Sequence, residues 1–168
     1  MSQSDATAEF DAALATAVRP EQAYDALQRL VERTIGARLF TVMDVVQDEM
    51  KGRRAFTSDP VSYPASGWIT LRENNWFDTV IRHHKTYVAN DIVQITRDFA
   101  DHALIESLGC RSIVNHPVLM SGTLVATINM LHEEGHFTPE RVSTIAKVLN
   151  PRALAAYEHY QNLKANRE

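Results

Sequence analysis

The segment His132–His136 carries the residue types that most often do metal chemistry. It reads HEEGH and matches H-E-x-x-H, the zinc-protease pattern in which two histidines one helical turn apart bind the metal. That pattern needs a helix, yet here it contains Gly135 and precedes Phe137-Thr138-Pro139, which is typical of a helix start. We therefore expect a polar loop between a strand and a helix, and we assign no metal ligand.

Two further stretches could carry chemistry. His83 and His84 are adjacent, and neighbouring residues of a helix point about 100° apart, so one metal ion cannot easily take both. A partly exposed helix end is the alternative. Cys110 is the only cysteine, which excludes an intramolecular disulfide and a multi-cysteine metal site. We find no Ser/His/Asp spacing and no glycine-rich phosphate loop, so no catalytic residue is assigned and any cofactor is unknown.

Composition and charge narrow the class of protein. The chain has 168 residues, of which 45% are hydrophobic and 23% charged, as in an ordinary soluble domain. Its net charge of -4 and its lack of long Lys/Arg runs argue against nucleic-acid binding. Its apolar stretches are shorter than a membrane span, and the start does not resemble a signal peptide. We expect a cytoplasmic protein with neither nucleic acid nor membrane as partner.

Hydrophobic periodicity and turn residues indicate the elements that must position these groups. We expect an N-terminal helix over 4–18, capped by Ser4 or Asp5, and a C-terminal helix over 138–165, kinked near Pro151. Between them lies a core over 20–137, with a helix from Pro20 that ends before Gly36. Further expected core elements are strands at 39–46, 52–59 and 85–90, a loop at 60–70, helices at 74–84 and 97–109, and a hairpin at 112–132. This order predicts a single α+β domain over 1–168 with a central antiparallel sheet of five to six strands.

Polar residues interrupt both arms of the hairpin. A two-residue turn at Ser121-Gly122 would pair Met120 with Thr123 and place Val114 opposite Asn129. One face of the hairpin would then hold Ser112, Val114, His116, Thr127 and Asn129, whereas Asn115 would lie on the opposite, nearly apolar face. A face that mixes apolar and polar side chains suits a ligand pocket. The alternative is that these groups only satisfy each other or the backbone, and a bulge would swap the sorting.

The segments YVANDI, from Tyr87, and LGCRSIVNHPVLMSGTLVATINMLHEEGHFTPERV, from Leu108, resemble the GAF domain. The resemblance covers about residues 20–160, and Ala126 departs from a glycine that many members carry. The matching positions are Asp91, Gly109 with Ser112, Pro117-Val118, Gly122, Ile128-Asn129-Met130 and Phe137-Thr138.

The resemblance implies a GAF/PAS-like sheet flanked by helices on both faces, with a small-molecule pocket on one face. Asp91 and His102 would contact the ligand from the loop and helix above the sheet, although a helix cap and a surface histidine are the simpler interpretations. Four aromatic residues could form a lid or be ordinary packing: Tyr63, Trp68, Trp76 and Phe99. The Cys-His pair of bilin-binding relatives and the Asn-Lys-Phe-Asp-Glu set of cyclic-nucleotide relatives are absent, so the ligand stays unidentified.

We therefore expect a sensory or regulatory module that binds a small molecule and acts through a separate output protein or a homodimer. The terminal helices are the expected dimer surface, because Phe10, Leu14, Tyr157 and Tyr160 exceed the needs of one core. Two alternatives stay open. One is a GAF-fold enzyme that uses Cys110 for redox chemistry or histidines for a metal, and the other is a ligand-free dimerisation module.

Overall fold

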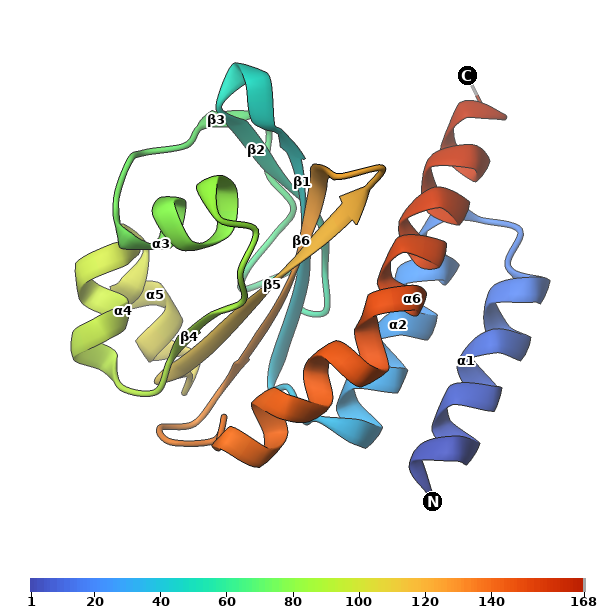
Figure 1. The fold of residues 1–168 in the computed structure, drawn as a ribbon, viewed down its shortest axis with the longest axis horizontal. Coiled ribbons are helices and arrows are strands. Elements are labelled where there is room, and N and C mark those ends of the chain that lie inside the picture. Colours follow the sequence, from blue (N-terminus) through green and yellow to red (C-terminus); the bar gives the residue numbers. More distant parts are fainter. Residues whose placement is uncertain (168) are drawn as a thin grey trace. The chain divides into compact units, whose positions relative to one another are not determined.

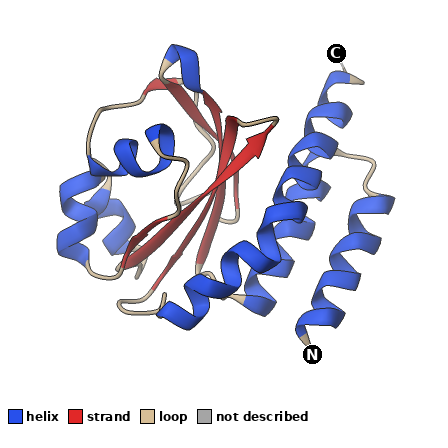
Figure 2. Cartoon of the chain, in the orientation of Figure 1, coloured by secondary structure: helices blue, strands red, loops and turns tan. Residues whose placement is uncertain are grey.

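The computed structural model describes residues 1–167, and the chain forms two compact units. The first comprises residues 1–36 and the C-terminal segment from Arg141, and the second comprises Ala37–Glu140. Figure 1 traces the chain through its elements, and Figure 2 separates helices from strands. The first unit is all helical, whereas the second contains every strand of the described residues.

The helical unit contains α1 (Gln3–Thr16), α2 (Pro20–Thr34) and most of α6 (Pro139–Ala165). The expected cap of α1 is wrong by two to three residues, because Ser2 is the N-cap. Its hydroxyl accepts a hydrogen bond from the Asp5 backbone N–H at 3.1 Å, and the Asp5 carboxylate accepts one from the Ser2 N–H. Helix α2 begins at Pro20 and ends before Gly36. Gly36 has a positive φ of 89°, and its N–H donates to the Val31 carbonyl, which closes the helix.

Helix α6 is continuous through Pro151. Proline has no N–H to donate to the carbonyl of Lys147 and its ring crowds that turn, so a bend rather than a straight axis is expected there. The ribbon changes direction in its middle part (Figure 1). Nearby, the Arg152 guanidinium donates to the Val148 carbonyl at 3.2 Å, which gives a carbonyl of this turn a side-chain donor.

The second unit is built on a six-stranded sheet with the order β3-β2-β1-β6-β5-β4. Its strands are β1 (Leu39–Val46), β2 (Lys51–Thr57), β3 (Ile69–Thr70), β4 (Tyr87–Ala89), β5 (Ser112–Met120) and β6 (Thr123–His132). Every paired neighbour is antiparallel. The prediction of an α+β class with a central antiparallel sheet is therefore confirmed.

The β5–β6 hairpin turns at Ser121 and Gly122, as expected. Both residues have positive φ, 51° and 79°, which is the backbone of the type I′ turn that suits the twist of a hairpin. Met120 pairs with Thr123, but the register then shifts, because Val125 is an extra residue on β6. Beyond this bulge, Asn115 lies opposite Asn129. The predicted register is therefore wrong for most of the hairpin.

Short helices lie together on one side of the sheet (Figure 1). They are α3 (Asn75–Phe77), which runs into the π-helical turn η2 (Asp78–Arg82), followed by α4 (Ile92–Asp98) and α5 (His102–Ser107). A separate 3₁₀ turn, η1 (Gln47–Glu49), links β1 to β2. The single helix predicted over 97–109 is wrong, because the chain breaks between α4 and α5. Side chains from these helices pack with Ile113 and Leu131 of the sheet to form the core of this unit.

No helix within residues 1–167 combines the length and the apolar character that crossing a bilayer requires.

Candidate functional site

A cavity of about 520 Å³ lies on the helix-bearing face of the sheet. This volume falls within the range of small-molecule sites, which runs from about 300 to 1,000 Å³. Strands β1, β2, β5 and β6 contribute the floor, and the walls come from the β2–β3 loop, β3 with the segment after it, α3 and the α4–α5 junction. The lining residues are Thr41, Met43, Arg54, Tyr63, Ser66, Ile69, Thr70, Leu71, Arg72, Asn74, Trp76, Asp98, Phe99, Ala100, Asp101, Ile113, Asn115, Asn129 and Leu131.

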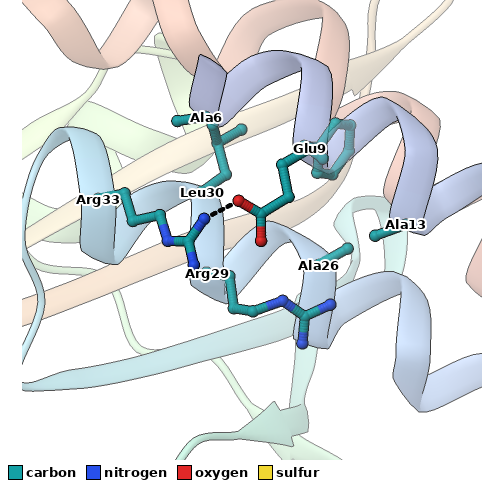
Figure 3. Close-up of a pocket in the computed structure, with 8 residues that line it drawn as sticks. Ala6, Glu9, Ala13, Ala26, Arg29, Leu30 and Arg33 are labelled. Carbon is teal, nitrogen blue, oxygen red and sulfur yellow. Dashed lines mark ion pairs between the residues drawn. The ribbon is translucent and has the colours of Figure 1, made fainter. Parts of the chain in front are cut away.

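The helical unit has a second hollow, between α1 and α2, which is far smaller (Figure 3). Its volume is about 10 Å³, which is near the lower limit for a single water molecule. Glu9 forms an ion pair with Arg33 across it, and Arg29 lies beside them (Figure 3). This hollow is too small for a small-molecule ligand, whereas the cavity on the sheet is large enough for one, so we take that cavity as the candidate site.

The floor of the cavity carries a connected set of buried hydrogen bonds. The Trp76 indole N–H donates to Asn115 Oδ1 at 3.1 Å, and Asn115 Nδ2 donates to Asn129 Oδ1 at 2.6 Å. Asn129 Oδ1 also accepts from the Thr127 hydroxyl at 2.9 Å, while Asn129 Nδ2 donates to the Thr41 hydroxyl at 3.0 Å. These five residues join four elements, β1, α3, β5 and β6, beneath one cavity.

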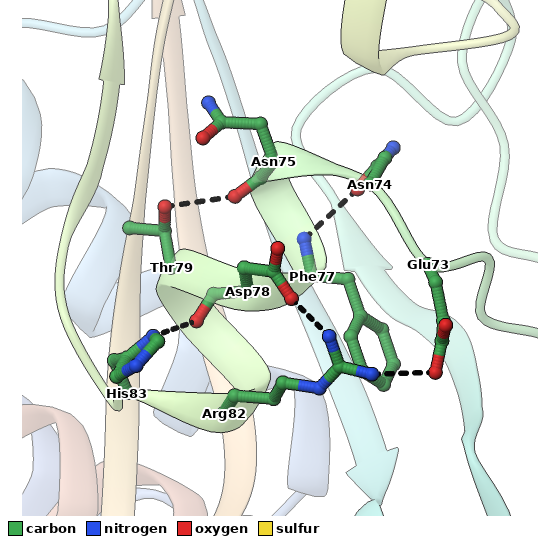
Figure 4. Close-up of polar contacts among 8 residues, drawn as sticks. All are labelled: Glu73, Asn74, Asn75, Phe77, Asp78, Thr79, Arg82 and His83. Atoms are coloured by element: carbon green, nitrogen blue, oxygen red, sulfur yellow. Dashed lines mark hydrogen bonds and ion pairs between the residues drawn. The ribbon is translucent and has the colours of Figure 1, made fainter.

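The α3–η2 segment holds Trp76 in place over this floor. The Asn74 side chain caps α3 by accepting from the Phe77 N–H at 2.9 Å, and it donates to the Asp98 carbonyl at 2.9 Å. Figure 4 shows the cap together with the helical turns that follow it. Asn74 therefore ties the start of α3 to the end of α4, two of the walls of the cavity.

The turn η2 has a π-helical hydrogen bond, from the His83 N–H to the Asp78 carbonyl. Single π turns occur often at functional sites. The Arg82 guanidinium bridges Glu73, at 2.5 Å, and Asp78, and so clamps the two ends of this segment together (Figure 4). The ion pairs lie on the exposed side, so they brace the segment without entering the cavity.

The β2–β3 loop reaches the opposite wall through Tyr63. Its hydroxyl donates to the Asp101 carboxylate at 2.6 Å, and the Arg54 guanidinium stacks 3.5 Å from the ring centre. Arg54 also donates to the Pro64 carbonyl at 2.7 Å. Burial and the Asp101 charge raise the pKa of Tyr63 above its usual value, because both disfavour the phenolate. The loop is thus fastened across the cavity by a neutral phenol.

A second tyrosine, Tyr87 of β4, also binds the junction between α4 and α5. The Tyr87 hydroxyl donates to the Asp98 carboxylate at 2.7 Å, and its ring meets Phe99 edge-on at 5.8 Å between ring centres. Burial raises the pKa of Tyr87, and the hydrogen bond to Asp98 acts in the same direction. Asp98 and Asp101 both line the cavity, so its wall carries two carboxylates that accept from tyrosines.

The structure brings only some of the predicted site residues to this cavity. Tyr63, Trp76, Phe99 and Asn129 line it, and Thr127 supports Asn129 from the same face. Asp91 is the N-cap of α4, accepting from the Gln94 N–H at 2.9 Å. His102 begins α5 and does not line the cavity. Trp68 is 47% exposed and lies beneath the Arg53 guanidinium, outside the cavity.

Three predicted pocket residues lie on the wrong face. Because of the bulge at Val125, Ser112, Val114 and His116 point away from the cavity, and Asn115 takes their place on the floor. The Ser112 hydroxyl donates to the Glu133 carbonyl at 2.6 Å, and His116 Nδ1 shares a hydrogen bond of 2.8 Å with the Thr86 hydroxyl. The sorting was wrong because the pattern of the strands does not reveal the extra residue. Asn115 was the signal, since it was the one polar side chain on the otherwise apolar face.

The HEEGH segment is a loop, as predicted, because β6 ends at His132 and α6 begins at Pro139. His132, Glu133 and His136 form the one cluster of possible metal ligands found within residues 1–167. However, the two imidazoles are stacked, with ring centres 3.6 Å apart and an interplanar angle of 6°. Lone pairs of parallel rings cannot converge on one ion, and His132 Nδ1 already accepts the Glu133 N–H at 2.8 Å. This geometry does not suit a metal.

Cys110 is fully buried and does not line the cavity. Burial raises the pKa of the thiol, although the Arg38 charge opposes this effect. A reactive cysteine needs the thiolate, so the arrangement favours an inert thiol.

Comparison with known proteins agrees with this architecture. The family model of the GAF domain matches residues 19–151, whereas the comparison with curated proteins found no match. The GAF domain of a phosphoenolpyruvate-protein phosphotransferase from Coxiella burnetii is similar, with a TM-score of 0.71, 13% identity and coverage of 97% of this chain and 96% of that chain.

Two further structures have the same fold. The GAF domain of an Acinetobacter phosphoenolpyruvate-protein phosphotransferase has a TM-score of 0.69 at 11% identity, covering 96% of this chain and 98% of that chain. Free methionine-R-sulfoxide reductase from Neisseria meningitidis, solved with its substrate, has a TM-score of 0.66 at 13% identity, and the match covers 98% of this chain and 91% of that chain. Such low identities show a shared fold alone. The match of the family model over most of its length shows that this chain belongs to the GAF domain family.

Proposed function

We propose that this GAF domain is a sensory or regulatory module that binds a small molecule in the cavity on its sheet. The family is one of ligand-binding regulatory modules, and the observation that carries the proposal is the cavity itself. Its volume of about 520 Å³ and its mixture of apolar walls with a few buried polar groups are those of a small-molecule site.

Ligand occupancy can change the protein in two places. The β2–β3 loop is fastened by Tyr63 to Asp101, and α3 is fastened by Asn74 to the end of α4. A ligand that contacts these walls stabilises the closed arrangement by its differential affinity, which is how binding becomes a signal. The signal would pass to a separate output protein or to a second copy of the chain.

A homodimer through α1 and α6 is part of the proposal. Leu14 and Tyr157 stay partly exposed, whereas Phe10 is buried and Tyr160 stacks on Tyr24 at 4.3 Å between ring centres. The surface available to a partner is therefore smaller than the sequence suggested. Light scattering after size-exclusion chromatography tests this part: a dimer that Leu14→Glu converts to a monomer is expected, and a monomeric wild type would contradict it. We also propose a cytoplasmic location.

The enzyme alternative receives less support. Redox catalysis through Cys110 would need a thiolate and a resolving thiol, yet the chain has one cysteine and its thiol is buried. The stacked pair of His132 and His136 lacks the geometry of a metal site.

Native mass spectrometry of protein purified from its own cells tests the binding function. We expect a retained small molecule in the wild type and its loss in Ala100→Trp, because Ala100 is an exposed residue that lines the cavity. Ala103→Trp is the matched control, since Ala103 is also exposed, lies three positions further along the chain and does not line the cavity. A wild type without ligand, or equal retention in both variants, would argue against the proposal.

A further inference from the structure

The orientation of the two amides on the cavity floor is set by a group that can only donate. The indole N–H of Trp76 has no acceptor capacity, so the Asn115 atom 3.1 Å from it must be the carbonyl oxygen. The Asn115 nitrogen therefore points to Asn129, and the Asn129 atom that meets it at 2.6 Å must be the oxygen. A flip of either amide would bring two donors together.

The same direction continues to the threonines. With its oxygen toward Asn115, Asn129 presents its nitrogen to the Thr41 hydroxyl at 3.0 Å, so Thr41 accepts there and its own proton points elsewhere. The Thr127 hydroxyl is compatible with this arrangement, because it donates to Asn129 Oδ1. The direction of every hydrogen bond in the set thus follows from one tryptophan.

Three protons of this set are left over, whereas the oxygens of Asn115, Asn129 and Thr41 each already accept at least one hydrogen bond. Each Asn side chain has two N–H bonds and uses one of them within the described residues, and the Thr41 O–H is the third unused donor. Thr41, Asn115 and Asn129 are 2%, 4% and 8% exposed, and all three line the cavity. Buried donors without a partner are costly, so a group bound here must accept.

The floor is also without charge where these donors meet. Its neighbours Met43, Ile113 and Leu131 are apolar, and the Arg54 side chain is engaged with Tyr63 and the Pro64 carbonyl. We propose, on the basis of the proposed binding function, that the ligand places an uncharged acceptor oxygen, such as that of a ketone, amide or lactam, on the floor formed by Asn115, Asn129 and Thr41. A donor group in that position would leave these three protons unpaired.

Three small probes of similar size test whether the floor prefers an acceptor to a donor. Acetophenone has an acceptor oxygen, α-methylstyrene replaces that oxygen with a methylene group, and aniline presents donors. Nitrogen–proton NMR follows the side-chain amides, which are assigned from the signals lost in Asn115→Leu and Asn129→Leu. The two indole signals are assigned with Trp76→Phe, and Trp68 outside the cavity is the internal control.

We expect acetophenone to shift the Asn115 and Asn129 amide signals and to bind roughly tenfold more tightly than either other probe. In Trp76→Phe the Asn115 amide is free to flip, so this preference should shrink, whereas Trp68→Phe should keep it. Equal binding of all three probes at the floor, or tighter binding of aniline, would overturn the inference and leave the binding function intact. Failure of every probe to shift a cavity residue would overturn the proposed function and the inference together.

Discussion

Replacing Asn115 and Asn129 by leucine, singly and together, tests whether the floor is one hydrogen-bonded unit. Asn115→Leu removes the acceptor of the buried Trp76 N–H and one donor to Asn129. Asn129→Leu removes the acceptor of the Thr127 hydroxyl and of the Asn115 N–H that donates to Asn129. An unpaired buried polar group costs about 1–3 kcal/mol, so each single variant should lose that amount of unfolding free energy.

The double variant should lose less than the sum of the two single variants. Each single variant breaks the hydrogen bond between Asn115 and Asn129 and leaves the polar group of the remaining asparagine without its partner. In the double variant both the donor and the acceptor of this bond are absent. We expect a coupling of about 1 kcal/mol, which lies in the range measured for residues in one network. The assay is urea unfolding, checked by thermal melts, in which 1 kcal/mol shifts the midpoint by about 2–4 °C in a protein of this size.

Asn162 provides the control, because it is exposed on α6 and its side chain belongs to no such set. Asn115→Leu combined with Asn162→Leu should be additive. If the Asn115 and Asn129 substitutions are additive too, the two amides do not share a hydrogen bond, and the floor does not have the proposed preference for an acceptor.

Three other measurements probe the surroundings of the site. The pKa values of Tyr63 and Tyr87 are raised above the ordinary 10.0, so above pH 10 the unfolded chain loses protons that the folded chain keeps. The unfolding free energy should therefore fall as the pH rises. In alkaline thermal melts, a variant with both tyrosines replaced by Phe should show a shallower fall. Gly109→Ala should lower the unfolding free energy by about 1–3 kcal/mol, because Gly109 has a φ of 78° and an added Cβ would lie 2.6 Å from a guanidinium nitrogen of Arg38. Gly67→Ala is the control: an added Cβ there would meet open space, so the same urea titration should show almost no change. Cys110 should resist a thiol reagent until the protein unfolds, and rapid labelling of the native state would contradict its burial.

Strong local signals made much of the fold predictable. Pro20 and Gly36 bracket α2 because proline fits a first helical turn and a glycine with positive φ closes the last. The turn at Ser121-Gly122 followed from its position between two apolar runs. The single helix expected over 97–109 failed, because its pattern contained the interruption at Phe99–Asp101 without a proline or glycine to mark it.

Three of the four aromatic residues expected at a lid line the cavity and Trp68 does not, for a physical reason. Tyr63 and Trp76 each combine an apolar ring with one polar atom, so they can line a cavity while bonding to Asp101 and Asn115. Trp68 has the same chemistry but lies on an exposed stretch beside Arg53. Side-chain type indicates what a residue can do at a cavity, whereas its place in the loop decides whether it is there.

The floor shows how one residue can decide the chemistry of a pocket. Alternation along the two hairpin strands was correct, but the extra Val125 reverses the face of everything beyond it. Without the bulge, the cavity would present Ser112 and His116 beside Asn129, a floor with both donors and acceptors and a group that can titrate. With it, Asn115 meets Asn129, and the donor-only indole of Trp76 orients both amides. The same residues therefore encode two different binding preferences, and the bulge selects the one that favours an acceptor.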